Sequence, residues 1–342
     1  MPEITESELK LRIKENPAGA YLLCGDETYL VKFYTQQLIK ATVEESFAEF
    51  NLHTFECTDM DLSEIYDASL SIPMMAASKC VVVKDYPAKD ASDKDLAALE
   101  ELLKENPPDN CLIFTYPTQQ PKATEIKKML GIFSEYGYVL KAGKKTPAEL
   151  AKVIEKGAKK RGKTFDKGVA SYLVTCVGDD LNQLGNELEK VCAYSGEVIK
   201  KSDVDAVCVR SLDANAIFMV MDLARGNFEK AFTTLSKLFE LREDEYMILG
   251  AVIAQYAFIY RAKAASTAGK SAGDIVAAYE SYKGKEKRLN TAAQMAKNMT
   301  FSQITACMEI LADADNQMKS TQNDKRMLLE QTFVKLARVK NQ

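Results

Sequence analysis

One eight-residue stretch has the residue types and spacing to bind a nucleotide. Gly157-Ala-Lys-Lys-Arg-Gly162-Lys163-Thr164 matches the phosphate-loop pattern GxxxxGK[ST]. That loop needs a strand before it and a helix after it, because backbone N–H groups and the helix dipole must converge on phosphate. Here the preceding residues, 147–156, have the spacing of an amphipathic helix. The pattern favours a basic helix–turn connection, and a nucleotide hydrolase using Gly157 to Thr164 remains the alternative.

A nucleotide-binding sheet would carry its phosphate loop after the first apolar run, at Gly25-Asp26-Glu27-Thr28. This turn lacks a second glycine and a Gly-Lys-Ser/Thr sequence, and its carboxylates would repel phosphate. The third apolar run ends in Val83-Lys84-Asp85, without the paired carboxylates of a magnesium-binding strand. We therefore expect an ATPase-like sheet with no catalytic residues, no cofactor and no metal of its own.

Other residues that catalyse reactions or bind metals are few or unsuitably spaced. The single histidine, His53, excludes multi-histidine metal sites and lies in a stretch typical of a strand, so we interpret it as structural. The eight cysteines form no CxxC pair and mostly lie in apolar runs, which predicts reduced, buried thiols. They are Cys24, Cys57, Cys80, Cys111, Cys176, Cys192, Cys208 and Cys307.

The segment 71–77 contains two adjacent methionines after a proline. Pro73 follows Ile72 and should end the preceding helix and set an extended entry into the next strand. Met74 and Met75 are neighbours, so they cannot share one face of a helix or strand. An exposed pair could enter an apolar pocket on a partner, a role that flexible thioethers suit. The more common outcome for such residues is packing into the local core, and composition leaves both open.

Apolar runs and helical patterns divide the chain. Over 1–141, five short apolar runs alternate with helical spacing, which predicts a parallel α/β sheet. Thr146-Pro147 is a strong helix start, with Glu149 placed for a capping box. From there only helical patterns follow, one of them beginning at Asn215. We expect an α/β domain over 1–141, followed by two all-α domains over 142–211 and 212–342.

Charge is distributed unevenly along the chain. Residues 1–100 hold 19 acidic and 9 basic residues, a net charge of −10, within an overall net charge of −4. Basic residues gather at 141–163 and 283–288, where they form either solvated helix faces or a weak nucleic-acid signal. No apolar run approaches the roughly 18 residues of a membrane span, and the acidic start does not resemble a signal peptide. We therefore expect a cytoplasmic location.

With these features in place, the whole sequence resembles the delta subunit family of the bacterial DNA polymerase III clamp loader. Tyr21-Leu-Leu-Cys-Gly-Asp-Glu-Thr-Tyr-Leu30 is similar to that family's first strand and turn. Ser71 to Lys84 resembles its clamp-inserting segment, although Met74 and Met75 replace the usual Leu-Phe or Phe-Phe. Three further stretches match in the same order. They are Gly178-Asp-Asp-Leu with Asn186 to Lys190, Ile217-Phe218 with Asp222 and Gly226-Asn227, and Ala314 to Lys319.

The resemblance implies a DNA replication role without catalysis by this chain. It implies an AAA+-like domain over 1–141 that binds and opens the sliding clamp (beta), with Ile72, Pro73, Met74 and Met75 as the clamp-binding residues. Residues 142–211 would be a lid-like domain. Residues 212–342 would join a collar with the gamma/tau and delta prime subunits, which hydrolyse ATP in the polymerase holoenzyme. Primed DNA would be a partner in the assembled complex. A non-enzymatic helical scaffold with an unrelated α/β head is the remaining alternative.

Overall fold

The computed structural model describes residues 3–56, 62–118, 121–122, 124–282, 285–320 and 324–339. Cys57 and Lys283, which the sequence analysis includes, lie outside these residues. The chain divides into two compact units, Met1–Lys145 and Thr146–Gln342. The boundary lies close to the predicted end of the α/β domain at residue 141. A further division of the second unit between residues 211 and 212 stays a prediction.

A five-stranded sheet forms the centre of the first unit, in the order β2-β3-β4-β1-β5. Neighbouring strands are parallel throughout. The three central strands, β1, β3 and β4, are buried along almost their whole length, as the sequence predicted, while the edge strands β2 and β5 are partly exposed. The strands are β1 (Gly19–Cys24), β2 (Leu52–Glu56), β3 (Lys79–Lys84), β4 (Asn110–Thr115) and β5 (Tyr138–Lys141).

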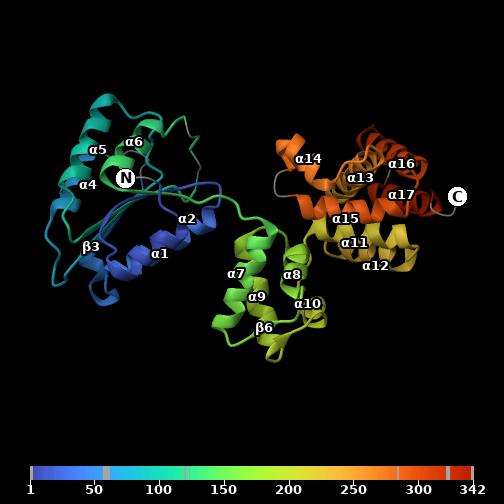
Figure 1. Cartoon of the computed structure of the whole chain (residues 1–342), viewed down its shortest axis with the longest axis horizontal. Helices are drawn as coiled ribbons and strands as arrows, with labels where there is room; N and C mark the ends of the chain where they lie inside the picture. Colours follow the sequence, from blue (N-terminus) through green and yellow to red (C-terminus); the bar gives the residue numbers. More distant parts are fainter. Residues whose placement is uncertain are drawn as a thin grey trace. The chain divides into compact units, whose positions relative to one another are not determined.

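Helices cover both faces of this sheet (Figure 1). On one face α4, α5 and α6 pack against the strands through Ile65, Leu99 and Phe133. On the other face α2 lies against β1, β3 and β4, and α1 packs beside α2. The helices are α1 (Glu6–Glu15), α2 (Thr28–Thr42), the one-turn α3 (Ala48–Asn51), α4 (Leu62–Leu70), α5 (Asp93–Glu105) and α6 (Lys127–Tyr136). Two helix layers around a parallel sheet place the connecting loops at the two ends of the strands, which we call the amino edge and the carboxyl edge of the sheet.

The second unit is built almost entirely of helices. The predicted capping box is present, because the Thr146 hydroxyl accepts from the Glu149 N–H and the Glu149 carboxylate accepts from Thr146. The elements are α7 (Pro147–Lys160), β6 (Thr164–Phe165), α8 (Val169–Val177), α9 (Leu181–Tyr194), β7 (Val198–Ile199), α10 (Lys201–Val207), α11 (Leu212–Arg225), α12 (Phe228–Glu240), α13 (Glu245–Thr267), α14 (Ala272–Ala278), α15 (Glu286–Lys297), α16 (Phe301–Ser320) and α17 (Lys325–Val339).

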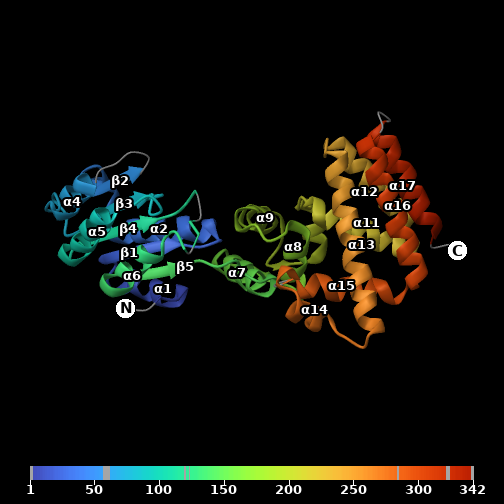
Figure 2. The same cartoon turned by 90° about the horizontal axis from the view of Figure 1, so that it is seen from above.

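Two details of this unit differ from the sequence-based expectation. The strands β6 and β7 form a parallel pair that patterning did not predict, because two residues are too few to show a period. The helix expected to begin at Asn215 begins at Leu212, since the Ser211 hydroxyl caps it by accepting from the Ala214 N–H. In the C-terminal part, α13 contacts α11, α15, α16 and α17 around one apolar core (Figure 2).

The described cysteines are free thiols, and all except the half-buried Cys208 are buried. His53 lies on β2, as expected. Among the residues that the structure describes, no helix is long and apolar enough to cross a membrane.

Candidate functional site

The turn between β1 and α2, where a phosphate loop would lie, is closed by protein backbone. The Glu27 N–H donates to the Ala142 carbonyl at 3.0 Å, and the Ala142 N–H donates to the Cys24 carbonyl at 2.7 Å. Gly25 has a φ of +128°, and a Cβ added there would lie 2.4 Å from the Ala142 carbonyl oxygen. The Glu27 N–H therefore points to Ala142, and the backbone of Ala142 occupies the space beside Gly25 where a phosphate would approach.

The GxxxxGK[ST] match is part of a helix–turn connection, which confirms the prediction from the sequence. Gly157 lies within α7, where an added Cβ would come 2.7 Å from a Leu188 methyl group of α9. Gly162 follows the helix with a φ of +71°. The Lys163 ammonium donates to the Ser195 carbonyl, 2.8 Å away, at the end of α9. This lysine thus binds a helix terminus within its own unit.

Two lysines of the basic stretch 141–163 form ion pairs with the chain's first residues. Lys141 pairs with Glu3, and the Lys145 ammonium lies 2.6 Å from a Glu6 carboxylate oxygen. The other oxygen of Glu6 accepts from the Tyr34 hydroxyl at 2.7 Å. Burial raises the pKa of Glu6, but the hydrogen bonds from Lys145 and Tyr34 outweigh it and hold that pKa below its ordinary value. These lysines serve the first unit's structure.

The segment between α4 and β3 forms an exposed apolar loop, which we define as residues 71–78 and call the apolar loop (Figure 1). The exposed fractions are 89% for Ile72, 55% for Met74 and 80% for Met75. Pro73 between them is half buried. The two methionines therefore do not pack into the local core. Met75 has a φ of +52°, in the left-handed backbone region that residues other than glycine rarely adopt.

The exposed side chains stand on a firmly held backbone. Asn51, at the end of α3, is only 1% exposed. Its side-chain oxygen accepts from the Met74 N–H at 2.7 Å, and its amide nitrogen donates to the Met74 carbonyl at 2.8 Å. The same nitrogen also donates to the Phe47 carbonyl at 3.1 Å. One buried side chain therefore fixes both backbone polar groups of Met74.

A second buried side chain holds the start of the apolar loop. The Lys79 ammonium donates to the carbonyls of Ala68 and Ser71 and, at 2.8 Å, to the Ser71 hydroxyl. These carbonyls end α4, where a cation is stabilised by the helix dipole. Burial lowers the pKa of Lys79, and the carboxylate of Asp109 opposes this shift. At the far end, the Ser78 hydroxyl donates to the Thr42 carbonyl at 2.7 Å.

The apolar loop lies at the amino edge of the parallel sheet, because it leads directly into the start of β3. The β1–α2 turn follows the end of β1 and so lies at the opposite, carboxyl edge. A partner that covers the apolar loop therefore need not approach the edge where an ATPase binds its nucleotide.

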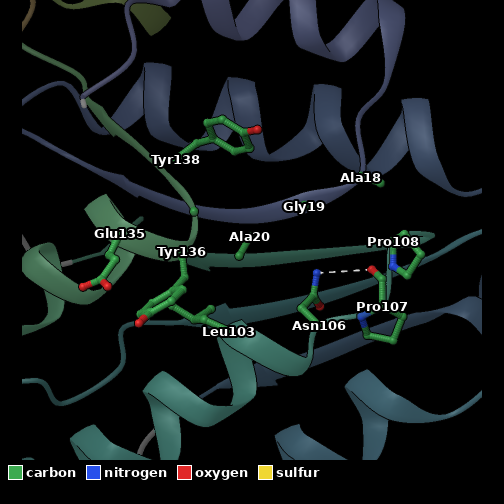
Figure 3. Close-up of a pocket in the computed structure, with 11 residues that line it drawn as sticks. Ala18, Gly19, Ala20, Leu103, Asn106, Pro107, Pro108, Glu135, Tyr136 and Tyr138 are labelled. Carbon is green, nitrogen blue, oxygen red and sulfur yellow. Dashed lines mark hydrogen bonds between the residues drawn. The ribbon is translucent and has the colours of Figure 1, made fainter. Parts of the chain in front are cut away.

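A shallow cavity of about 280 Å³ opens at the same amino edge, near the starts of β1 and β5 (Figure 3). Its walls are mainly backbone, proline and tyrosine, and the Asn106 amide nitrogen donates to the Pro107 carbonyl at 3.4 Å. Glu135 at its rim is one carboxylate, without the second group that acid–base catalysis uses. We assign no reaction to this cavity.

Sequence reasoning selected the exposed residues and missed those that hold them. Ile72, Pro73, Met74 and Met75 lie together in one loop, as neighbours in sequence must. Asn51 is 23 residues from Met74 and has no distinguishing pattern around it. Lys79 does have a signal, because it is a charged residue that begins the otherwise apolar run Lys79-Cys-Val-Val-Val-Lys84.

The parallel sheet order β2-β3-β4-β1-β5, followed in the chain by helices, places this protein in the AAA+-like class. Two family profiles narrow the class. The profile "DNA polymerase III, delta subunit" matches residues 21–134, and its C-terminal-domain counterpart matches residues 213–336. Together they cover more than half of the sequence, so the chain belongs to the DNA polymerase III delta subunit family.

Individual relatives agree with this assignment. The chain is 23% identical over 324 residues to DNA polymerase III subunit delta of Bacillus subtilis, covering 92% of each protein. It is 23% identical over 227 residues to a probable delta subunit of Aquifex aeolicus, covering 64% of this chain and 63% of the relative. The solved structure of the Bacillus subtilis DNA clamp loader delta protein is similar in fold, with a TM-score of 0.63, 22% identity, and coverage of 97% of this chain and 99% of that one.

Proposed function

We propose that this chain is the clamp-binding subunit of a bacterial clamp loader, and that it opens the sliding clamp (beta) for loading onto primed DNA. The observation that carries the proposal is the apolar loop, whose three large side chains are exposed while its backbone is held. Large apolar side chains that are held exposed at one place are typical of a surface that a partner covers.

In this proposal Ile72, Met74 and Met75 enter an apolar pocket on the clamp, and Pro73 sets their presentation. Complete burial of one such side chain contributes about 1.5–3 kcal/mol, so the loop can supply several kcal/mol of binding. Opening follows if the loop and the adjacent α4 bind the open ring more tightly than the closed one, because a ligand shifts an equilibrium only by its differential affinity. No reaction at this chain is required.

The other partners of the proposal belong to the second unit and to the assembled complex. Residues 212–342 would join a collar with the gamma/tau and delta prime subunits, which would hydrolyse the ATP. The exposed Leu241, Met247 and Met327 are apolar residues of this region that a subunit interface would cover. Primed DNA would meet the complex as a whole.

The test is clamp binding by the purified full chain without ATP, measured by surface plasmon resonance against the clamp of the same organism. The variant Met74→Ala/Met75→Ala should bind at least about 10-fold more weakly, since it lacks the two thioether side chains that the clamp would bury. The matched control is Met247→Ala/Met327→Ala, which removes two methionines that are 62% and 57% exposed in the second unit. It should bind the clamp like the wild type.

Binding that survives the Met74/Met75 change would keep the clamp function and move the contact elsewhere in residues 60–80. If the folded wild type binds no clamp, the proposal is refuted and the helical-scaffold alternative gains support. Equal loss in both double variants would show that the effect is not specific to the apolar loop.

A further inference from the structure

We propose that Asn51 is a positioning residue that presets the apolar loop for clamp binding. This inference rests on the proposed function and deepens it, because it assigns a role to a side chain that the clamp itself would not touch. Asn51 is buried, lies on a different element from the loop and is bonded to its centre.

The carboxamide of Asn51 forms hydrogen bonds with both backbone polar groups of Met74, its N–H and its carbonyl. It accepts from the N–H at 2.7 Å and donates to the carbonyl at 2.8 Å, which is the pattern that a paired strand would supply. A carboxamide offers a donor and an acceptor in this fixed geometry, whereas an ionised carboxylate offers acceptors only. Its second donated bond, to the Phe47 carbonyl at 3.1 Å, fixes the carboxamide itself on α3.

The position of Asn51 between α3 and the sheet restrains this pair of hydrogen bonds. Asn51 directly precedes β2, and Leu52 is the register partner of Cys80 on β3. Asn51 and Lys79 directly precede these two partners, so both lie at the amino ends of neighbouring strands. Asn51 holds Met74 and Lys79 holds Ser71, so Ile72 and Pro73 span two fixed points.

Fixing both points removes alternative loop conformations before the clamp arrives. A loop that occupies its binding conformation only a fraction of the time binds more weakly by that fraction. The left-handed backbone of Met75 makes the restraint more important, because an unrestrained methionine would leave that region. Without Asn51, we expect the presented conformation to fall to about a tenth of the population and affinity to fall about 10-fold.

The experiment is a double-mutant cycle on clamp binding by the full chain, with Asn51→Ala, Met74→Ala/Met75→Ala and their combination. Asn51→Ala should weaken binding about 10-fold in the wild-type background. In the Met74→Ala/Met75→Ala background it should change binding by less than about 2-fold, because the two methionines at the point that Asn51 holds are gone. A general loss of folding would lower binding equally in both backgrounds.

A matched control uses another buried asparagine of the same sheet edge. Asn110, at the start of β4, is buried and donates to the Asn106 side-chain oxygen at 2.7 Å. It makes no hydrogen bond to the apolar loop within the residues that the structure describes. Asn110→Ala should therefore leave clamp affinity within about 2-fold of the wild type.

Backbone amide exchange of the chain alone provides a readout that needs no clamp. The Met74 amide should exchange slowly although it lies in an exposed loop, and Asn51→Ala should bring it to the rate of the Met75 amide. Rapid exchange at Met74 in the wild type would overturn the inference, as would equal losses in both backgrounds of the cycle. If the wild type binds no clamp while Met74 is protected, the proposed function fails and the positioning of the loop by Asn51 stands.

Discussion

Replacing Gly25 by alanine tests whether the β1–α2 turn is closed against phosphate. A Cβ at this position would lie 2.4, 2.5 and 2.7 Å from the oxygen, nitrogen and carbonyl carbon of Ala142. All three are backbone atoms, so no side-chain rotation relieves the overlap. The φ of +128° is also a conformation that L-residues rarely adopt.

The loss of folding stability can be estimated from the contacts that the added Cβ would separate. Separating the segments would break the hydrogen bonds that join Ala142 to Cys24 and Glu27, at about 0.5–1.5 kcal/mol each. Holding alanine at the observed φ adds strain of about 1–3 kcal/mol. The sum is about 2–6 kcal/mol, a large part of the stability of an ordinary domain.

Cysteine labelling as a function of urea can measure this loss in the first unit alone. Cys24, Cys80 and Cys111 are buried there, whereas Cys176 and Cys307 are buried in the second unit. Peptide-resolved mass spectrometry therefore separates the two transitions, which a single spectroscopic signal would merge. With an m-value near 2 kcal/mol/M, labelling of the first group should move to lower urea by about 1–3 M.

The control is Gly143→Ala, one residue beyond Ala142. Nothing lies within 4 Å of a Cβ added at Gly143, so this variant should label like the wild type. If Gly25→Ala is as stable as Gly143→Ala, the turn has room that the structure does not show, and the argument against a phosphate site at this edge fails.

Three further outcomes are expected. Lys163→Ala should lower the stability of the second unit by about 0.5–1.5 kcal/mol, seen in Cys176 labelling, because the end of α9 loses its donor; nucleotide binding that depends on Lys163 would contradict this assignment. Lys79→Met should destabilise the first unit by about 1–3 kcal/mol in urea, since the carbonyls of Ala68 and Ser71 lose a charged donor, and an unchanged midpoint would refute it. Because the folded pKa of Glu6 lies below 4.5, its stabilising contribution is complete above that pH and is lost as pH falls through the folded value. The stability difference between the wild type and Glu6→Gln should therefore shrink on acidification below pH 4.5, and a constant difference would refute the role of Lys145.

Of the candidate site, the sequence could predict the exposed residues of the apolar loop but not the buried side chain that holds them. Ile72, Pro73, Met74 and Met75 could be selected because Pro73 interrupts a helix and adjacent methionines fit no single face. Their exposure was not decided by sequence, since core packing satisfied the same pattern. Asn51 could not be selected at all, because a bond across 23 residues depends on how β2 and β3 pair.

The sequence by itself determined most of the element types and the lack of phosphate-loop residues in the turn after β1. Apolar runs and helical spacing are local properties, so they predicted the strands of the first unit and the helices of the second. The turn at Gly25 has no second glycine and no Gly-Lys-Ser/Thr sequence, whatever its position in the fold. Only the tertiary structure decided the strand order, the closing of that turn by Ala142 and the fixing of Met74 by Asn51. These depend on contacts between distant segments, which no local pattern contains.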